Sequence, residues 1–510
     1  MATDSADTRL DPVIVGVATL TGRPGDPHAP DAVGWMTKAA GAALADASGS
    51  AALSAAAGWV GVAEGTWRCS DAGAVIAERL GLGGAGPVHT VRADVGIVQQ
   101  RLIAEACEAI QHGDTQAALV VGGESRARDR AIGKRGGAPS ETAGPKGAEP
   151  DEVIHPADEL MSDLELQRDL ATPATQYAIV EDALAHADGL DRAALRHRLG
   201  DLWSGFAAVA ADNPTAWDRS APSGETIVDP EGGNRMVADP YTRSLCSQWN
   251  VDAASALLLT SIELADRLGI PAGRRVVVEA TAESNLILPL PGRAVLHSWP
   301  AFDAVAEALA AHCGVPVDGG LAADVVDLYA CFPAAVQVQA RALGLPLDAA
   351  RLTATGGMTF GGGPLNNAAL ASTAAVVERL RHLAASGGPA RGLVTSISGM
   401  LTKPGAMMLS TAAPPTPFAA LDVTGEATDR SQELPVVPDL AGEAIVDGAT
   451  VITTFEGIRR AVAVVHATAG GSTVRGVATS DRDSVTASIA ELGGAGRSVT
   501  LDGVGGFDLR

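Results

Sequence analysis

Short apolar runs alternate with helical patterns along the first 125 residues of the chain. Apolar residues recur every three to four positions in the helical patterns, while the runs between them are continuous and short. The expected strands are residues 13–20, 59–65 and 117–121, and the expected helices are residues 31–48, 72–82 and 96–112. This order is that of βαβ units in an α/β sheet.

A second stretch with the same alternation begins at Val276 and runs to about Ser410. Two helices in it are expected to bury one face each, the first with Phe332, Val336, Ala340 and Leu343 and the second with Leu370, Ala374, Val377 and Leu380. The second helix follows a Gly-rich run at 356–367. The pattern therefore predicts two similar α/β halves, whose ligands would collect at loops that follow strands.

The residues between these halves have a different composition. Residues 126–151 are rich in Gly, Pro and charged side chains, which favours a surface excursion. Helices are expected to start at Thr172-Pro173 and at Asp191. We therefore expect an inserted loop domain, the lid, over residues 126–245. An apolar run resumes after it, and a return to the first half is expected over residues 246–275.

The composition changes again after residue 412. Residues 413–439 are Pro-rich and predict a linker. Beyond them, short strand-like runs, Gly-Gly turns and one helical stretch predict a small β-rich domain over 440–510, with an OB-like fold as the first hypothesis. The expected domains are an N-terminal half (1–125 plus 246–275), the lid (126–245), a C-terminal half (276–412), the linker (413–439) and the last domain (440–510).

Composition and charge narrow the classes of function. The 510 residues include 37 Lys and Arg against 60 Asp and Glu, and a net charge of −23 disfavours nucleic acid as a partner. Five scattered cysteines without a CxxC pair indicate neither a disulfide framework nor a zinc site, so no metal is expected. No stretch approaches the ~20 apolar residues of a membrane span, and the first residues lack a signal-peptide pattern. A cytoplasmic location is expected.

Four spaced segments resemble, in order, the active-site segments of thiolases: VVGGES (120–125), VDLYACFPAAVQVQARALG (326–344), TGGMTFGGGPLNN (355–367) and GLVTSISGMLTKPG (392–405). The chain is similar to sterol-carrier-protein-type thiolases and to thiolase-like proteins named acetyl-CoA acetyltransferases, over about residues 10–412. The resemblance implies a duplicated α/β thiolase fold with a five-layered αβαβα core. It also implies a lid over the site, coenzyme A or an acyl-CoA as ligand, and acyl transfer as the family activity.

Thiolase chemistry requires a nucleophilic cysteine at a helix N-terminus, a histidine that activates it, and a second cysteine that moves the α-proton. The resemblance places these roles at Gly96, Gly363 and Ile397, and none of these residues carries a reactive group. Where thiolases have an Asn or His for the oxyanion, this chain has Tyr329. Loss of a covalent nucleophile typically costs on the order of 10⁶ in rate, so ordinary thiolase activity is expected to be absent.

No cysteine is expected to replace the missing nucleophile. Cys107 lies about three turns into its helix and is assigned to the core. Cys331 stands where sterol-carrier-protein thiolases often have a cysteine that is not the nucleophile. The phenol of Tyr329 could hydrogen-bond a thioester oxygen or donate a proton, or it could only fill space.

Ligand contacts are expected from the same loops and from the start of the lid. The basic run at 126–135 could pair with the phosphates of coenzyme A or form a solvated loop. Because Gly replaces Cys and His at two loops, we expect the pantetheine tunnel to stay open or to widen. The candidate coenzyme A contacts are Gly96, Tyr329, Phe332, Gly362, Gly363, Pro364, Gly399, Arg126 and Arg128.

Three functions remain open at this point. The first is a protein that binds coenzyme A or an acyl-CoA without acyl transfer, linked to lipid or fatty-acid metabolism. The second is an acyl-CoA enzyme, either an acyltransferase of the acetyl-CoA acetyltransferase type or a retro-aldolase that uses Tyr329. The third is a structural partner without a ligand. No covalently bound cofactor is expected, and monomer and homodimer both remain open.

Overall fold

The computed structural model describes residues 10–48, 50–157, 159–316, 321–454 and 456–510. Residues 1–9, on which part of the signal-peptide expectation rests, lie outside this range. Eleven strands form one large sheet, in the order β10-β11-β12-β9-β1-β8-β4-β2-β3-β5 with β13 paired to β9. Its strands are β1 (Pro12–Thr21), β2 (Ala57–Ala63), β3 (His89–Ala93), β4 (Ala117–Ser125), β5 (Glu152–Ile154), β8 (Asp252–Ser261), β9 (Val276–Glu283), β10 (Val325–Asp327), β11 (Arg391–Ser398), β12 (Lys403–Ser410) and β13 (Ala419–Asp422).

The sheet consists of two halves that meet at a short antiparallel junction, where Val13 and Ile14 of β1 pair with Val277 and Val276 of β9. Strand β8 lies between β1 and β4, so the chain returns to the N-terminal half of the sheet after the lid. The helices of the N-terminal half are α1 (Ala32–Asp46), α2 (Ser50–Ala56), α3 (Ala72–Leu80), α4 (Arg101–His112), α5 (Arg126–Lys134) and α10 (Ile262–Arg267). Those of the C-terminal half are α11 (Pro300–Cys313), α12 (Pro333–Ala342), α13 (Ala349–Leu352), α14 (Gly357–Phe360), α15 (Ala368–Ser386) and α16 (Thr424–Arg430).

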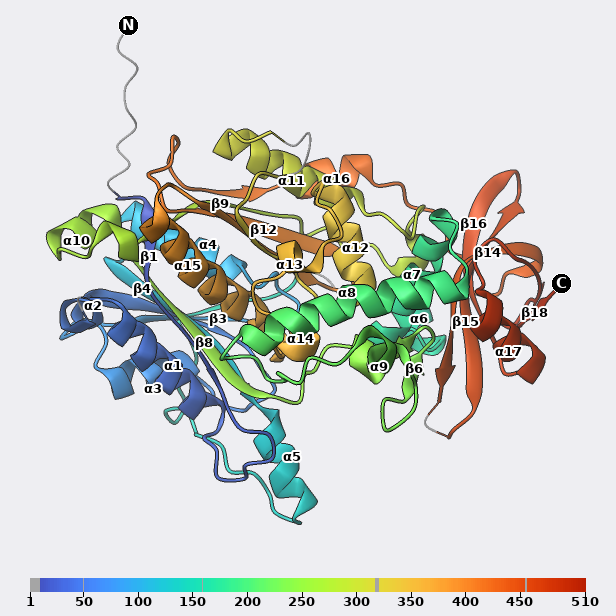
Figure 1. The fold of residues 1–510 in the computed structure, drawn as a ribbon, viewed down its shortest axis with the longest axis horizontal. Helices are drawn as coiled ribbons and strands as arrows, with labels where there is room; N and C mark the ends of the chain where they lie inside the picture. The colour runs from blue at the N-terminus through green and yellow to red at the C-terminus, as the bar shows by residue number, and fades with distance from the viewer. Residues whose placement is uncertain (1–9, 49, 158, 317–320, 455) are drawn as a thin grey trace, which may run out of the picture.

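Helices α4 and α15 lie between the two halves of the sheet and share one apolar core with both. Helices α1 and α3 cover the outer face of the N-terminal half, and α11 covers that of the C-terminal half with α12 beside it. The result is the five-layered αβαβα arrangement that the sequence predicted (Figure 1). No helix in the described part of the chain combines the length and the apolar character needed to cross a membrane.

The middle helix α4 starts later than expected. Residues 96–112 were the expected range, but the first helical residue is Arg101. Gly96 has φ +106°, in the left-handed region that favours glycine, so it cannot continue a right-handed helix. Leu102, Ala106 and Ile110 face the core as the periodicity predicted.

The start of the lid differs from its expected boundary. Strand β5 pairs in parallel with β3, so the chain between 126 and 154 returns to the edge of the N-terminal half. Pairing with β5 satisfies backbone groups that β3 would otherwise leave exposed at the edge of the sheet. Helices α7 and α8 pack on α12 and α13. The remaining lid elements are α6 (Asp163–Gln167), α7 (Pro173–Ala187), α8 (Arg192–Asp212), α9 (Gly224–Val228), β6 (Met236–Ala238), β7 (Tyr241–Thr242) and η2 (Arg243–Leu245).

The expected linker contains regular structure. Strand β13 pairs with β9 and helix α16 packs on α11, so residues 419–430 extend the C-terminal half and are not a bare connection. Three further short 3-10 turns are η3 (Ala272–Arg274), η4 (Leu290–Gly292) and η5 (Leu365–Asn367).

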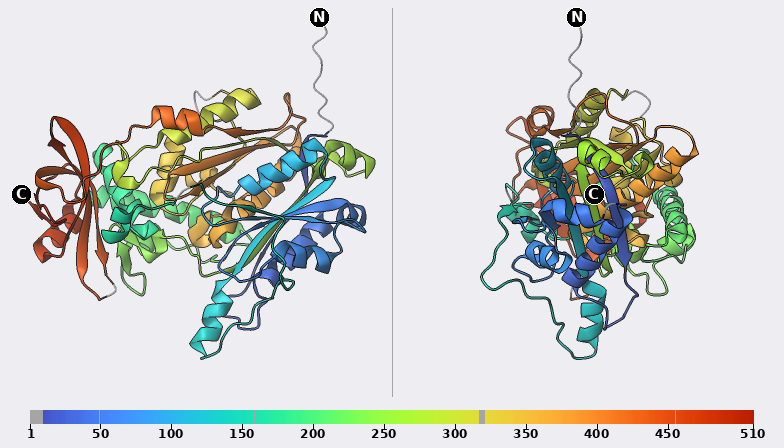
Figure 2. Two further views of the ribbon diagram at one scale, coloured as in Figure 1. Left: turned by 180° about the vertical axis from the view of Figure 1, so that it is seen from behind. Right: turned by 90° about the vertical axis from the view of Figure 1, so that its left-hand side faces the viewer.

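The last domain is β-rich, as expected, and lies at one end of the molecule (Figure 2). Its strands pair in the order β16-β15-β14-β17-β18, and an isolated parallel bridge joins Thr479 of β16 to Gly506 beside β18. It is not separate from the lid: β6 pairs with β14, and Val462, Val464 and Val477 belong to the same apolar core as α7. Its elements are β14 (Ala441–Thr453), β15 (Arg459–Ala469), β16 (Ser472–Ser480), α17 (Asp483–Leu492), β17 (Ser498–Asp502) and β18 (Phe507–Leu509).

Candidate functional site

Gln99 joins the loop before α4 to the Gly-rich loop before α15. Its side-chain Nε2 donates to the carbonyl of Leu365 at 3.2 Å, and its Oε1 accepts from the backbone N–H of Ala369 at 2.7 Å. The same Nε2 lies 3.5 Å from the phenol oxygen of Tyr329. The side chain of Gln99 therefore links its own loop to two of the four segments that carried the resemblance to thiolases.

Tyr329 is fixed through its backbone by the strand that follows in the sheet. Its N–H donates to Thr395 Oγ1 at 2.8 Å, and its carbonyl accepts from Gln339 Nε2 at 2.9 Å. Burial raises the pKa of the phenol well above its usual value, the nearby Cys331 raises it further, and the bond with Gln99 opposes the shift. The phenol is therefore neutral at physiological pH and can act as a hydrogen-bond donor, not as a base.

The cavity beside Tyr329 is very small. Tyr329 and Gly362 are among its lining residues, and its volume is about 30 Å³. A cavity of this size holds on the order of one water molecule. The expectation that the tunnel stays open or widens is therefore wrong for this structure, because neighbouring side chains occupy the space that the missing residues would have left.

Leu160 of the lid fills the space over Gly96 and Gly399. A Cβ built on Gly96 would lie 3.3 Å from Leu160 Cδ1, and a Cβ built on Gly399 would lie 2.9 Å from Leu160 Cδ2. Both glycines have positive φ values, +106° and +60°. The structure thus brings Gly96 and Gly399 to the same leucine, and a larger side chain at either position would require Leu160 to move.

Gly363 is covered in a similar way. A Cβ at Gly363 would lie 3.1 Å from Met358 Cε and 3.2 Å from Met358 Cβ. The N–H of Gly363 donates to the carbonyl of Gln248, and the N–H of Gln248 donates to the carbonyl of Met358. This loop is therefore tied to the segment that follows the lid, and Met358 occupies the space beside Gly363.

A buried lysine lies directly under Gly96. Lys403 Nζ donates to the Gly96 carbonyl at 2.9 Å, and the residue is only 1% exposed. Burial lowers the pKa of Lys403, and the carboxylate of Glu283 opposes this shift. Beside it, Ser396 Oγ donates to Gln100 Oε1. Polar side chains thus hold in place the loop in which thiolases carry their nucleophile.

Sequence reasoning missed these polar residues. Gln99 and Gln100 stand in the segment ADVGIVQQ, and Lys403 stands in the motif GLVTSISGMLTKPG. The available signal was the presence of amide and amine side chains within motifs that are otherwise Gly-rich and apolar. Such residues must find partners when buried, so they predict contacts between loops.

Two other expected site residues belong to the core. Ile397 is 4% exposed and pairs with Pro404 across β11 and β12. The ring of Phe332 stacks on Tyr177 and Tyr241, with centroids 4.7 and 5.6 Å apart. Phe332 is not among the residues that line the small cavity beside Tyr329. Pro364 is buried next to Gly363, and its carbonyl accepts from Asn367.

The two arginines at the start of α5 differ in their surroundings. Arg128 is 5% exposed, and its guanidinium bonds to Asp129 at 2.9 Å and to the Ser140 carbonyl at 2.7 Å. The guanidinium of Arg128 is therefore bonded within its own excursion, which leaves it little exposed to a ligand. The guanidinium of Arg126 lies 3.6 Å from the centre of the Trp249 ring, a cation–π contact.

Arg126 also lies near the Gly-rich loop. Its backbone N–H donates to the carbonyl of Val251 at 3.1 Å. Val251 Cγ1 is 3.6 Å from the position of a Cβ on Gly362, which lines the small cavity. One residue therefore separates Arg126 from the cavity wall.

Neither candidate cysteine has the surroundings of a nucleophile. Cys107 is fully buried, and burial raises the pKa of its thiol well above the usual value. Burial also raises the pKa of Cys331 to about 12, although a hydrogen bond with Tyr177 opposes the shift. Both thiols are protonated at neutral pH, in agreement with the expectation from the sequence.

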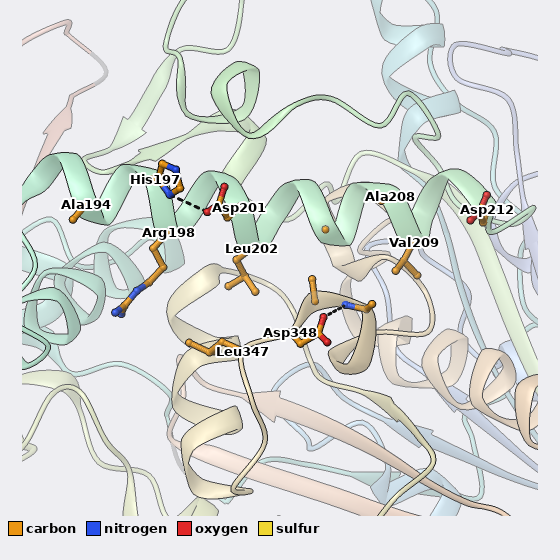
Figure 3. A pocket seen from close by; sticks show the side chains of 13 residues that line it. Ala194, His197, Arg198, Asp201, Leu202, Ala208, Val209, Asp212, Leu347 and Asp348 are labelled. Carbon is orange, nitrogen blue, oxygen red and sulfur yellow. Dashed lines mark hydrogen bonds and ion pairs between the residues drawn. The ribbon is translucent and has the colours of Figure 1, made fainter.

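A larger cavity lies elsewhere, between α8 and the segment around α13 (Figure 3). Its volume is about 750 Å³, and Leu202 lies opposite Leu347 across it. On its rim, His197 Nδ1 lies 2.9 Å from Asp201 Oδ2, one helical turn away. None of the residues expected from the sequence lines this cavity. No group of three or more metal-binding side chains occurs among the described residues.

Comparison with known proteins supports the fold. Neither a protein-family model nor a curated protein sequence matches the chain. Among solved structures, a monomeric SCP2-thiolase-like protein type 1 from Mycobacterium smegmatis matches with a TM-score of 0.79 and 23% identity, over 98% of this chain and 99% of that one. An acetyl-CoA acetyltransferase from Syntrophomonas wolfei matches with a TM-score of 0.54 and 17% identity, over 79% and 99%.

Human mitochondrial 3-ketoacyl-CoA thiolase, solved in complex with CoA, matches with a TM-score of 0.52 and 17% identity, over 80% of this chain and all of that one. The two thiolase enzymes thus leave about a fifth of this chain unmatched, whereas the Mycobacterium smegmatis protein matches nearly all of it. The chain has the thiolase fold, and the resemblance stated from its motifs is confirmed at the level of the fold.

Proposed function

We propose that this protein binds coenzyme A or an acyl-CoA and does not transfer acyl groups. The observation that carries the proposal is the state of the thiolase-like loops. They keep their Gly and Pro framework, while Gly96, Gly363 and Ile397 stand where reactive side chains are required. A ligand site of the fold is retained without the chemistry that would turn the ligand over.

The likeness to a thiolase solved with CoA supports this class of ligand. Arg126 would contact the phosphates, because its charge is next to the Gly-rich loop and its guanidinium suits phosphate oxygens. Arg128 has no such role here. Tyr329, Gly362, Gly363 and Gly399 would border the thioester end, and the link to lipid or fatty-acid metabolism is part of the same proposal.

Binding is expected to be weak, because the cavity must open first. Leu160 and Met358 occupy the space above the glycines, and only the fraction of molecules in which they have moved accepts a ligand. The apparent dissociation constant is the intrinsic one divided by that fraction. We expect a dissociation constant in the high micromolar range. We also propose that the protein is cytoplasmic.

A retro-aldolase or acyltransferase is the second candidate. Tyr329 favours it, since a neutral phenol lines the cavity and lies near Gln99. Such an enzyme would use the phenol as a proton donor to a thioester or carbonyl oxygen. Turnover of an acyl-CoA that is lost in Tyr329→Phe would establish this function in place of simple binding.

The C-terminal domain supports two further parts of the proposal. Its strand order, with α17 between the third and fourth strands and a parallel bridge from the third to the fifth, supports an OB-like fold. The cover of β5 on the edge of β3 supports a monomer, as does the match to a protein described as monomeric.

Calorimetry with coenzyme A, acetyl-CoA and longer acyl-CoAs tests the proposal. Binding should weaken several-fold with added salt and in Arg126→Ala. Arg130→Ala is the matched control, because Arg130 is exposed on the same helix α5. Absence of binding at millimolar coenzyme A would leave only the structural-partner function, and a released product would support the enzyme.

A further inference from the structure

Three histidines meet in a cavity between the lid, the C-terminal half and the last domain. The cavity has a volume of about 280 Å³ and is lined by His186 of α7, His297 of the loop before α11 and His466 of β15. The chain contains ten histidines in all, so nearly a third of them line this one cavity. Helix α7 packs directly on β14, which forms another wall (Figure 1).

A buried arginine shares the cavity wall. Arg475 of β16 has a side chain that is 3% exposed. Its Nη2 donates to the carbonyl of Ala294 at 2.8 Å, and its Nε lies 3.1 Å from Asp447 Oδ2. Its Nη1 has no hydrogen-bond partner in the described part of the chain. A buried guanidinium with an unused donor is costly, and an anion nearby would lower that cost.

Asp447 is the one carboxylate among the described lining residues, and it is already engaged twice. Its Oδ1 lies 2.9 Å from His466 Nδ1, and its Oδ2 faces Arg475. This pairing leaves the Nε2 of His466 free for another partner. Apolar side chains, among them Ile445, Val295 and Leu296, complete the wall.

The charge of the cavity depends on pH. Arg475 and Asp447 carry opposite charges that cancel, so a proton on His297 would make the cavity cationic. Burial lowers the pKa of His297, Arg341 and His186 lower it further, and Asp188 opposes them. A bound anion would stabilise the charged imidazole of His297 and raise its pKa. Binding of the anion would therefore be coupled to uptake of a proton.

We propose that this cavity is a binding site for a small oxyanion, a phosphate or carboxylate group, held by His186, His297 and His466 beside Arg475. The site lies at the junction of three parts of the chain, so the anion would link the last domain to the lid and to the C-terminal half. In a protein of net charge −23, it brings three imidazoles and a guanidinium together around a single carboxylate. The proposal does not depend on coenzyme A binding.

Sulfate is the first probe, because its charge is constant between pH 6 and pH 8 and any pH dependence then belongs to the protein. Calorimetry on the full chain should give a dissociation constant at least five-fold lower at pH 6.0 than at pH 8.0. Sulfate should also raise the thermal midpoint at pH 6.0 more than chloride at equal ionic strength. Inorganic phosphate and acetate, compared with sulfate, distinguish the two kinds of oxyanion.

His466→Gln and His186→Gln should each weaken sulfate binding at pH 6.0 by about five-fold or more. His197→Gln is the control, since His197 is exposed on α8 and lines a different cavity. Equal stabilisation by chloride and sulfate would overturn the proposal. Unchanged binding in both cavity variants, or binding that does not depend on pH, would overturn it as well.

Discussion

Leu160 lies over Gly399, with its Cδ2 atom 2.9 Å from the position that a Cβ on Gly399 would occupy. The same side chain lies over Gly96 from the other side. One residue of the lid therefore fills the space over both glycines. The lid is thus packed directly on two of the loops that carry the proposed ligand site.

Removal of this side chain should open the site. In Leu160→Ala we expect coenzyme A to bind several-fold more tightly, because a larger fraction of the molecules has the space over the glycines open. Calorimetry measures the change. Leu166→Ala is the control, since Leu166 is 51% exposed on the same lid. Equal or weaker binding in Leu160→Ala would show that Leu160 does not block the ligand.

A cysteine at position 96 should not restore a thiolase. The φ of +106° at Gly96 and the contact with Leu160 both oppose a side chain, and we expect Gly96→Cys to lower the free energy of unfolding by about 1–3 kcal/mol. Denaturant unfolding checks this, with Gly425→Cys as control because nothing lies within 4 Å of a Cβ there. Mass spectrometry after treatment with acetyl-CoA should show no acetyl group on Cys at 96.

Asp182 is expected to hold the last domain on the lid. Its Oδ2 accepts from the backbone N–H groups of Ala449 at 3.0 Å and of Ala495 at 2.8 Å, and its Oδ1 lies 3.3 Å from Arg192. Asp182→Ala leaves these buried groups without partners, and a loss of about 3–5 kcal/mol is expected for breaking a buried ion pair.

Limited proteolysis of Asp182→Ala tests whether the last domain has become looser. Cleavage should move to residues 430–440, ahead of the last domain, and should be faster than in the natural protein. Asp188→Ala is the control, since Asp188 follows the same helix but pairs with Arg341 of the C-terminal half. If Asp182→Ala is as resistant as the control, the apolar core alone holds the domain.

Glu181 should make stability fall as pH rises. Burial raises its pKa to about 7, while hydrogen bonds from Tyr241 and Gln337 and the charges of Arg198 and Arg341 oppose the shift. The folded state therefore binds one more proton than the unfolded chain between about pH 4.5 and pH 7, and stability declines through this window. The expected loss is at most about 3 kcal/mol.

Unfolding in denaturant at pH 5.0 and at pH 8.0 measures how much the free energy of unfolding falls between these two values. Glu181→Gln keeps the shape of the side chain and cannot ionise, so it should show a smaller decline than the natural protein between these two values. An equal decline in both proteins would assign the pH dependence to other buried carboxylates.

Much of the fold could be predicted because it follows local patterns. The periodicity of α4 and α15 identified the faces that form the central layer, and Gly113 marked the end of α4 correctly. The partner of β5 could not be predicted, since a three-residue strand inside a Gly- and Pro-rich excursion has no pattern of its own. The same holds for β13, four residues long in a Pro-rich segment.

For the candidate site, the motifs identified the loops but not the side chains that fill the space beside them. Position 96 could be identified as lacking a thiol from the sequence alone, whereas Leu160 comes from the lid, 64 positions away along the chain. No local pattern relates the two. The role of Gln99 in tying three segments together likewise depends on distances that only the folded chain defines.

Strand β5 has a consequence for the shape of a binding curve. By occupying the backbone groups of Val91, Arg92 and Ala93 on β3, it leaves no free template there for a strand of another molecule. In the monomer that we propose, a change at one site has no neighbouring site to reach. Coenzyme A should therefore titrate along a simple hyperbola with a Hill coefficient of one at every protein concentration, as equilibrium dialysis can verify.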